Sequence, residues 1–167
     1  MKHIGQILLD SGKLSEDDLS EARKIALNEG TRLEEALMHE NKISEKDFLE
    51  VVSHHFGLQY LSNIPENHLS TAQITKLPIK YLKKQCIFPY QEMNGTLFVA
   101  VNDPFRLEAL DDLRIIFSKE EVVAVLAPAR EIYAAINRTF GEADNSADQI
   151  IQDLDQGEDD KLLTDLE

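Results

Sequence analysis

Apolar residues in the first 56 positions recur at three- and four-residue steps, the spacing of a single buried helix face. The pattern is clearest at residues 19–26 and 48–56, and a shorter apolar patch precedes each of these stretches. It predicts four short helices between residues 3 and 56. We expect them to form two helical hairpins that bury their apolar faces on each other.

The two predicted hairpins are copies of one sequence. When His3 is aligned with Arg32, Gly-Lys-Leu-Ser-Glu-Asp-Asp-Leu at residues 12–19 falls on Asn-Lys-Ile-Ser-Glu-Lys-Asp-Phe at residues 41–48. Self-similarity at a fixed spacing indicates a repeated structural unit. Each copy is therefore predicted to be a short helix, a tight turn and a longer helix.

The residues at the predicted turns support these helix boundaries. Gly12 and Asn41 stand where the first helix of each copy must end, and both residue types tolerate the left-handed conformation found there. Ser15 and Ser44 stand where the second helix begins, with an aspartate three residues further on. A serine hydroxyl at this place accepts a hydrogen bond from a free backbone N–H, so both serines are predicted to be N-caps.

The pattern changes after residue 57. Branched and aromatic residues at 87–90 and 96–101 predict two strands, and Asn94-Gly95 between them predicts a tight hairpin turn. An amphipathic helix is expected at 106–117. The residues expected to face inward on it are Leu107, Leu110, Leu113 and Phe117.

Further elements complete the second half. A third strand is expected at 121–126 and a last helix at 129–140, with helical patches at 67–76 and 79–85. The predicted fold class is α+β, with a small helical bundle followed by a ββαβα unit that has a three-stranded sheet. The expected domains are residues 1–60 and 61–141, with 142–167 as an acidic, disordered tail or linker.

Charge separates that tail from the rest of the chain. The net charge is −14, and residues 141–167 carry ten Asp or Glu and a single Lys. Nucleic-acid binding needs clustered Lys and Arg to neutralise phosphates, so nucleic acid is not an expected partner. A protein partner with a basic face fits this acidic surface better.

Other classes of function lack their residue patterns. No phosphate-binding loop, dinucleotide fingerprint, nucleophile elbow or zinc-protease motif occurs, so we expect neither an enzyme nor a cofactor. The adjacent His54 and His55 would point about 100° apart on a helix, so no metal site is expected there.

Cys86 is the only cysteine and is expected to be a small buried residue. Neither a secretory signal nor a membrane-spanning run is found, so membrane insertion is not expected and a cytoplasmic location is.

The order of motifs resembles the N-terminal region of the type II secretion and type IV pilus-assembly ATPases, the general secretion pathway protein E family. The repeat is similar to that family's Arg-Leu-Gly-x-x-Leu-x-x-x-Gly pattern. Leu77-Pro78, the Asn-Gly hairpin and Ala100-Val101-Asn102-Asp103-Pro104 are similar to its next domain, and the resemblance runs from about residue 3 to 141. The family's C-terminal ATPase domain does not follow here. An excised N-terminal piece and a stand-alone relative both remain open.

The resemblance implies two alternative functions. In one, this region binds the cytoplasmic part of an inner-membrane platform protein, or the ATPase itself, and so recruits or regulates the motor. In the other, the repeat binds cyclic di-GMP. The positions that correspond to the nucleotide-binding pattern are His3, Ile4, Gly5, Gly12, Arg32, Leu33, Leu37 and His55.

This chain departs from the nucleotide-binding pattern at several of its positions. His3 replaces the arginine of the first copy, and Glu34 replaces the glycine of the second, where an acid would repel an anionic ligand. The closing glutamine is replaced in both copies, by Ala26 and His55. We therefore predict a protein-binding module, with the repeat kept for packing, and retain the cyclic di-GMP sensor as the alternative.

Overall fold

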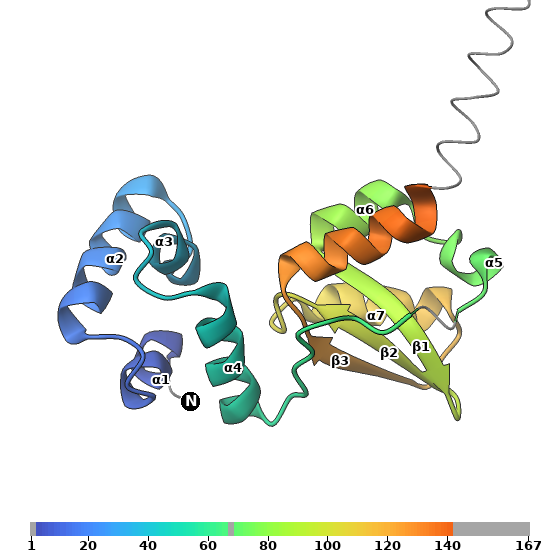
Figure 1. Ribbon diagram of the computed structural model, residues 1–167, viewed down its shortest axis with the longest axis horizontal. Helices are drawn as coiled ribbons and strands as arrows, with labels where there is room; N and C mark the ends of the chain where they lie inside the picture. The colour runs from blue at the N-terminus through green and yellow to red at the C-terminus, as the bar shows by residue number, and fades with distance from the viewer. Residues whose placement is uncertain (1–2, 67–68, 142–167) are drawn as a thin grey trace, which may run out of the picture.

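The computed structural model describes residues 3–66 and 69–141, and Figure 1 shows them as two lobes joined by an extended connection. The predicted acidic tail, residues 142–167, lies outside the described residues. The fold is α+β, as the sequence predicted. None of the described helices is both long and apolar enough to cross a bilayer.

The first lobe holds the four predicted helices, α1 (Ile4–Asp10), α2 (Glu16–Glu29), α3 (Leu33–His39) and α4 (Glu45–Phe56). Gly12 and Asn41 take the left-handed conformation, at φ +74° and +55°, because the chain must reverse there after a short helix. Ser15 and Ser44 cap α2 and α4 by accepting hydrogen bonds from the backbone N–H three residues on. The predicted turns and caps are thus confirmed.

The second lobe is built on a three-stranded sheet in the order β1-β2-β3. β1 (Ile87–Met93) and β2 (Thr96–Val101) form the predicted antiparallel hairpin, with Asn94 and Gly95 both at positive φ. β3 (Glu121–Leu126) pairs with β2 in parallel. β1 runs three residues beyond its predicted end, and a register shift between Pro89 and Gln91 leaves Tyr90 without a partner on β2, as in a β-bulge beside a proline.

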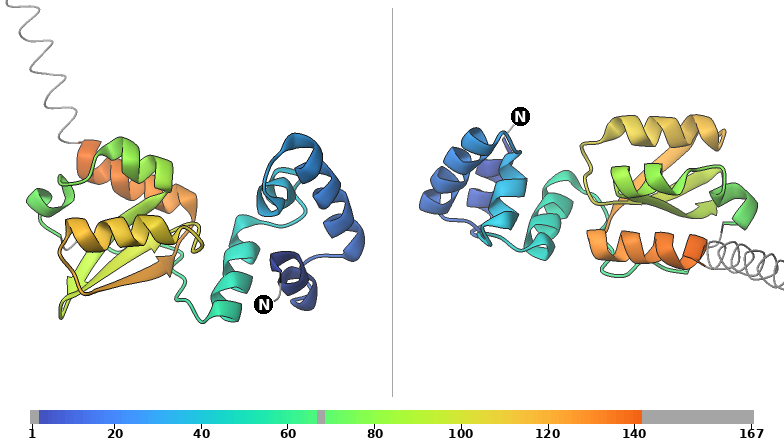
Figure 2. Two further views of the ribbon diagram at one scale, coloured as in Figure 1. Left: turned by 180° about the vertical axis from the view of Figure 1, so that it is seen from behind. Right: turned by 90° about the horizontal axis from the view of Figure 1, so that it is seen from above.

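Helices cover both faces of this sheet. α7 (Leu107–Ile116) makes the crossover from β2 to β3, and the helix at residues 129–141 lies on the opposite side, with α6 (Ile79–Gln85) between them (Figure 2). Of the helical patch predicted at 67–76, residues 67 and 68 lie outside the described residues. Within 69–76 the helix is shorter than predicted, since α5 covers Thr71–Ile74 alone and the Leu77-Pro78 step stops it from continuing.

Leu107 corrects the predicted inward face of α7, because 63% of this residue is exposed. It begins the helix and lies about 120° around the axis from the fully buried Leu113, at 100° per residue. The buried stripe instead runs through Ala109, Leu113 and Phe117, four residues apart. The apolar residues from Leu107 to Leu113 cover a wider sector of the helix surface than the sector that contacts the sheet. The sequence pattern alone therefore placed Leu107 on the buried face by mistake.

Cys86 is half-buried, which corrects the prediction of a buried residue. It is the C-cap of α6 and adopts φ +50°, a conformation more usual for glycine or asparagine. Burial raises the pKa of its thiol above the ordinary value. A half-buried thiol with a raised pKa is a poor nucleophile, so no reactive role is assigned to it.

Apolar packing runs through both lobes and the connection between them. Leu8 and Leu37 are fully buried in the first lobe, and Phe88 and Leu126 are buried in the second. Residues 59–61 of the connection bond to the end of β3, since Leu126 N–H donates to the Gln59 carbonyl and the Leu126 carbonyl accepts from Leu61. The connection therefore extends the edge of the sheet and fixes where α4 leaves it.

Candidate functional site: the repeat and the lobe junction

The two copies of the repeat have matching backbone geometry. His3 and Arg32 are the N-caps of α1 and α3, at φ −70°, ψ 151° and φ −77°, ψ 152°. Each copy continues through a left-handed turn to a helix capped by serine. The sequence repeat is therefore a structural repeat.

Ion pairs connect the copies reciprocally. The Lys13 Nζ of the first copy lies 2.9 Å from Asp47 Oδ1 of the second, and the Lys42 Nζ of the second lies 3.2 Å from Asp18 Oδ1 of the first. Lys13 aligns with Lys42 and Asp18 with Asp47, so each turn lysine contacts the other copy's helix start. Such an exchange is what a two-fold arrangement of identical units produces. The copies thus pack as a pseudo-symmetric pair.

These contacts shift the pKa values of both aspartates in the same direction. Hydrogen bonds from Ser15 and then Lys42 lower the pKa of Asp18, and hydrogen bonds from Lys13 and then Ser44 lower the pKa of Asp47. A carboxyl group whose pKa is lower when folded stabilises the protein above its unfolded pKa. That stabilisation is lost as the pH falls through the folded value.

We therefore expect the urea midpoint of unfolding to fall as the pH is lowered from about 5 to about 3, a window that starts above the ordinary Asp pKa of about 3.9 and ends below it. In the double variant Asp18→Asn, Asp47→Asn the amide cannot titrate, so the fall over this window is expected to be smaller. Urea unfolding followed by circular dichroism at both pH values measures this difference. An identical fall in both proteins would contradict a role for the two aspartates.

The predicted site residues of the first copy lie on and around α1. His3 is exposed, whereas Gly5 is buried beneath α2. A Cβ placed on Gly5 would stand 2.9 Å from Leu19 Cδ1, which is closer than normal packing permits. Ile4 packs against the core and Gly12 forms the turn. In this copy, glycine at position 5 is explained by close helix packing.

Arg32 in the second copy contacts the other lobe through its pairing with Asp103. Its Nη1 donates to Asp103 Oδ2 at 2.5 Å, and its Nη2 forms an ion pair with Glu34. Partial burial alone would lower the pKa of Arg32, but its hydrogen bond and charge pairing with Asp103, helped by Glu34 and Glu35, raise it overall. The guanidinium is therefore already neutralised by two carboxylates.

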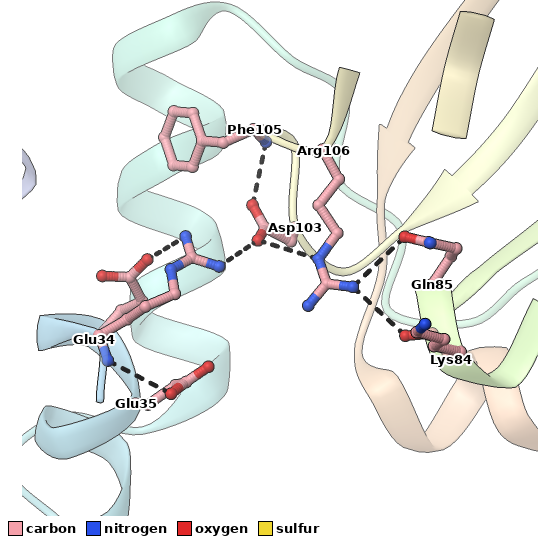
Figure 3. Close-up of polar contacts among 8 residues, drawn as sticks. Glu34, Glu35, Lys84, Gln85, Asp103, Phe105 and Arg106 are labelled. Atoms are coloured by element: carbon pink, nitrogen blue, oxygen red, sulfur yellow. Dashed lines mark hydrogen bonds and ion pairs between the residues drawn. The ribbon is translucent and has the colours of Figure 1, made fainter. Parts of the chain in front are cut away.

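Asp103 organises the junction between the lobes. Besides Arg32, it accepts a hydrogen bond from the Phe105 N–H at 2.9 Å and lies 3.5 Å from Arg106 Nε. Arg106 Nη1 donates in turn to the Lys84 carbonyl and to Gln85 Oε1, each at 3.3 Å (Figure 3). The sequence marked Asp103 only as part of the Ala100–Pro104 motif that resembles the family's second domain. Its contact with Arg32 spans 71 positions and carries no local signal.

Other contacts reinforce this junction. The Phe56 and Phe105 rings meet edge to face with centroids 5.5 Å apart, and Asn102 Nδ2 lies 3.3 Å from Glu45 Oε2. A cavity of about 110 Å³ remains between the lobes, with Arg32, Glu34 and Asp103 among its lining residues. This volume is small compared with the 300–1,000 Å³ of ordinary ligand pockets. The junction is therefore built as a contact between lobes.

A larger groove opens elsewhere in the first lobe, between α1 and α4. Its volume is about 480 Å³. The groove is lined by Ile7, Asp10, Ser11, Lys13, Glu50, Val51, His54 and His55. His55, the last predicted site residue, is exposed on this groove and stacks edge-on with Phe56 at 4.8 Å. The sequence did not reveal the groove, because its walls come from two helices that meet only in the folded chain.

The predicted site residues are therefore distributed over three environments. His55 lines the α1/α4 groove, and Arg32 lies at the lobe junction. Leu37 is fully excluded from solvent in the core, and Leu33 packs against that core. Within residues 3–66 and 69–141, no group of three or more His, Cys, Asp or Glu side chains is placed to hold a metal ion.

Comparison with known proteins assigns the family. The MshEN domain model matches residues 56–146, more than half of the chain. The type IV pilus assembly ATPase PilB of Myxococcus xanthus is 27% identical over 153 residues, covering 90% of this chain and 26% of the relative. Type II secretion system protein E of Xanthomonas campestris is 26% identical over 157 residues, covering 91% and 27%. The chain thus spans about a quarter of the length of these relatives.

Solved structures share the fold. The structure of MshE with cdg has a TM-score of 0.70 at 23% identity, covering 83% of this chain and 99% of that one. The N-terminal domain of XpsE has a TM-score of 0.66 at 23% identity, covering 83% and 98%. The chain therefore resembles the N-terminal region of the type II secretion and type IV pilus ATPases, as its sequence predicted, and it belongs to the MshEN domain family.

Proposed function

We propose that this chain is a non-catalytic docking module that recruits or regulates a secretion or pilus ATPase at an inner-membrane platform protein. The observation that carries the proposal is the open groove between α1 and α4, on the repeat lobe. Ile7 and Val51 give it an apolar floor, and the charged residues Asp10, Lys13 and Glu50 stand on its rim. An apolar floor with a polar rim suits an amphipathic helix of a partner protein.

The partner on this proposal is the cytoplasmic part of the platform protein, with a basic face toward this chain. The chain is acidic as a whole, so opposite charge steers such a partner toward it and disfavours acidic competitors. The module then stays on the cytoplasmic side and reaches the inner membrane through the partner. The ATPase activity in the relatives' names is assigned to the part of their length that this chain does not span.

Val51→Glu tests the groove, because it places a charge on the apolar floor without altering a fully buried residue. We expect at least about tenfold weaker binding of the platform protein's cytoplasmic part, as is typical when a central interface contact is lost. Leu27→Glu is the matched control, since Leu27 is 84% exposed on α2 and lies outside the groove. Isothermal titration calorimetry measures both. Equal loss in the two variants, or none in either, would contradict docking in the groove.

Cyclic di-GMP binding is the second candidate, and the likeness to MshE with cdg favours it. The paired state of Arg32 speaks against it, because a phosphate would have to displace Glu34 or Asp103. A titration of the chain with cyclic di-GMP in the same calorimeter distinguishes the two functions. Heat that saturates at micromolar ligand and is abolished by Arg32→Ala would make the chain a sensor.

We also propose that residues 1–60 and 61–141 form two domains. The side-chain contacts described at the junction are polar pairs and one aromatic contact, and each lobe also buries apolar residues of its own within a cluster that continues through the connection. A thermal test of this division is given in the Discussion.

A further inference from the structure

One face of the second lobe gathers basic side chains. Lys80, Lys83 and Lys84 are exposed on α6 at positions i, i+3 and i+4, which places them on one side of that helix. Arg130 and Arg138 are exposed on the helix at residues 129–141. We refer to these five side chains as the basic face.

The two helices of the basic face lie side by side. The Tyr133 hydroxyl on the helix at 129–141 donates to the Lys83 carbonyl of α6 at 3.2 Å, and Figure 2 shows both helices on the same side of the lobe. Tyr133 itself is 39% exposed. An exposed aromatic ring therefore bridges the two helices that carry the five cations.

Carboxylates leave the basic face largely unneutralised. In the described part of the chain, Lys80, Lys83, Lys84 and Arg138 form no ion pair. Arg130 lies 3.6 Å from Glu131, but its own side chain remains 90% exposed. Among the other described lysines, Lys13, Lys42, Lys46 and Lys119 are each paired with a carboxylate, whereas the separate Lys24 and Lys76 form no ion pair. Unpaired cations concentrated on one face of a chain with net charge −14 call for an anionic partner.

We propose that the basic face binds the acidic residues of 142–167 in the same chain. That segment starts where the helix at 129–141 ends, so it is tethered to the edge of the basic face. It carries ten Asp or Glu side chains and a single Lys, Lys161. Tethering gives it an effective concentration that a free acidic segment of another protein must exceed. The basic face is then available to an acidic partner only when that partner displaces the segment.

The basic face lies on the second lobe and the α1/α4 groove on the first, so the result of testing one does not depend on the result of testing the other. Zero-length carbodiimide crosslinking of the whole chain tests it, because the reagent joins a lysine amine to a carboxylate only where the two are in contact. We expect crosslinks from Lys80, Lys83 and Lys84 to residues 142–167, identified by mass spectrometry. Raising the salt concentration to about 0.5 M should reduce them, since screening weakens contacts between exposed charges.

Two matched variants sharpen the test. Arg130→Glu with Arg138→Glu keeps all three lysines and is expected to reduce these crosslinks about five- to tenfold, as weakened exposed ion pairs would. Lys24→Glu with Lys46→Glu makes the same change in net charge on the first lobe and should leave them unchanged. Mixing chains of two isotope compositions separates contacts within a chain from those between chains. Missing crosslinks, equal yields in both variants, or crosslinks mainly between chains would overturn the proposal.

Discussion

Leu37→Ala is expected to lower the free energy of unfolding by about 2–5 kcal/mol, the range for removing a fully buried leucine side chain. Leu37 has no exposed surface and lies on α3 at a position that the family pattern reserves for leucine. The loss combines the transfer of the removed carbons to water with the cavity left behind. Urea unfolding followed by circular dichroism measures it.

The repeat provides a matched partner for this variant. Leu8 is the counterpart of Leu37 in the first copy and is also fully buried, so Leu8→Ala is expected to cost a similar amount. Leu27→Ala is the control, because Leu27 is 84% exposed and a surface change of this kind stays within about 0.5 kcal/mol. If Leu37→Ala cost no more than Leu27→Ala, the packing role of the repeat would be refuted.

Phe88→Ala is expected to cost about 3–5 kcal/mol, because Phe88 is 1% exposed in β1 and truncating a buried phenylalanine leaves a large cavity. The ring lies under the helix at residues 129–141, where Ala135 and Arg138 line a surface hollow with it. The loss therefore weakens the attachment of that helix to the sheet. Met93→Ala at the end of β1 serves as the control, since Met93 is 51% exposed.

Calorimetry on the two core variants also tests the proposed division into domains. If residues 1–60 and 61–141 unfold separately, Leu37→Ala should lower the temperature of one transition and Phe88→Ala that of the other. Two-state unfolding, with a single transition that both variants lower, would show that the lobes act as one cooperative unit. In that case the contacts of Arg32 with Asp103 and of residues 59–61 with β3 would be strong enough to couple them.

Local signals explain what could be predicted. The four helices of the first lobe, the left-handed turns and the Asn94-Gly95 hairpin all depend on residues within a few positions of one another. The order of strands and helices in the second lobe followed from the same kind of pattern. The predicted ends of the helices and strands were less accurate, as β1 and α5 show. A bulge or a following proline changes where an element ends without changing the apolar pattern.

The candidate site was only partly foreseeable. The repeat pointed to Arg32 and His55, but it did not indicate that Arg32 faces Asp103 or that His55 stands on a groove. Leu107 was assigned to the buried face because its spacing fits a wide apolar stripe, and only the sheet shows how narrow the contact is. In each case the deciding neighbour belongs to another element.

By itself, the sequence determined which segments are helices and strands, where the copies of the repeat begin, and that the chain is acidic. The tertiary structure decided which side chains meet. The exchange of Lys13 and Lys42 between the copies and the pairing of Arg32 with Asp103 join residues that lie up to 71 positions apart. The physical reason is that backbone conformation responds to near neighbours, whereas ion pairs and grooves depend on how the finished elements pack.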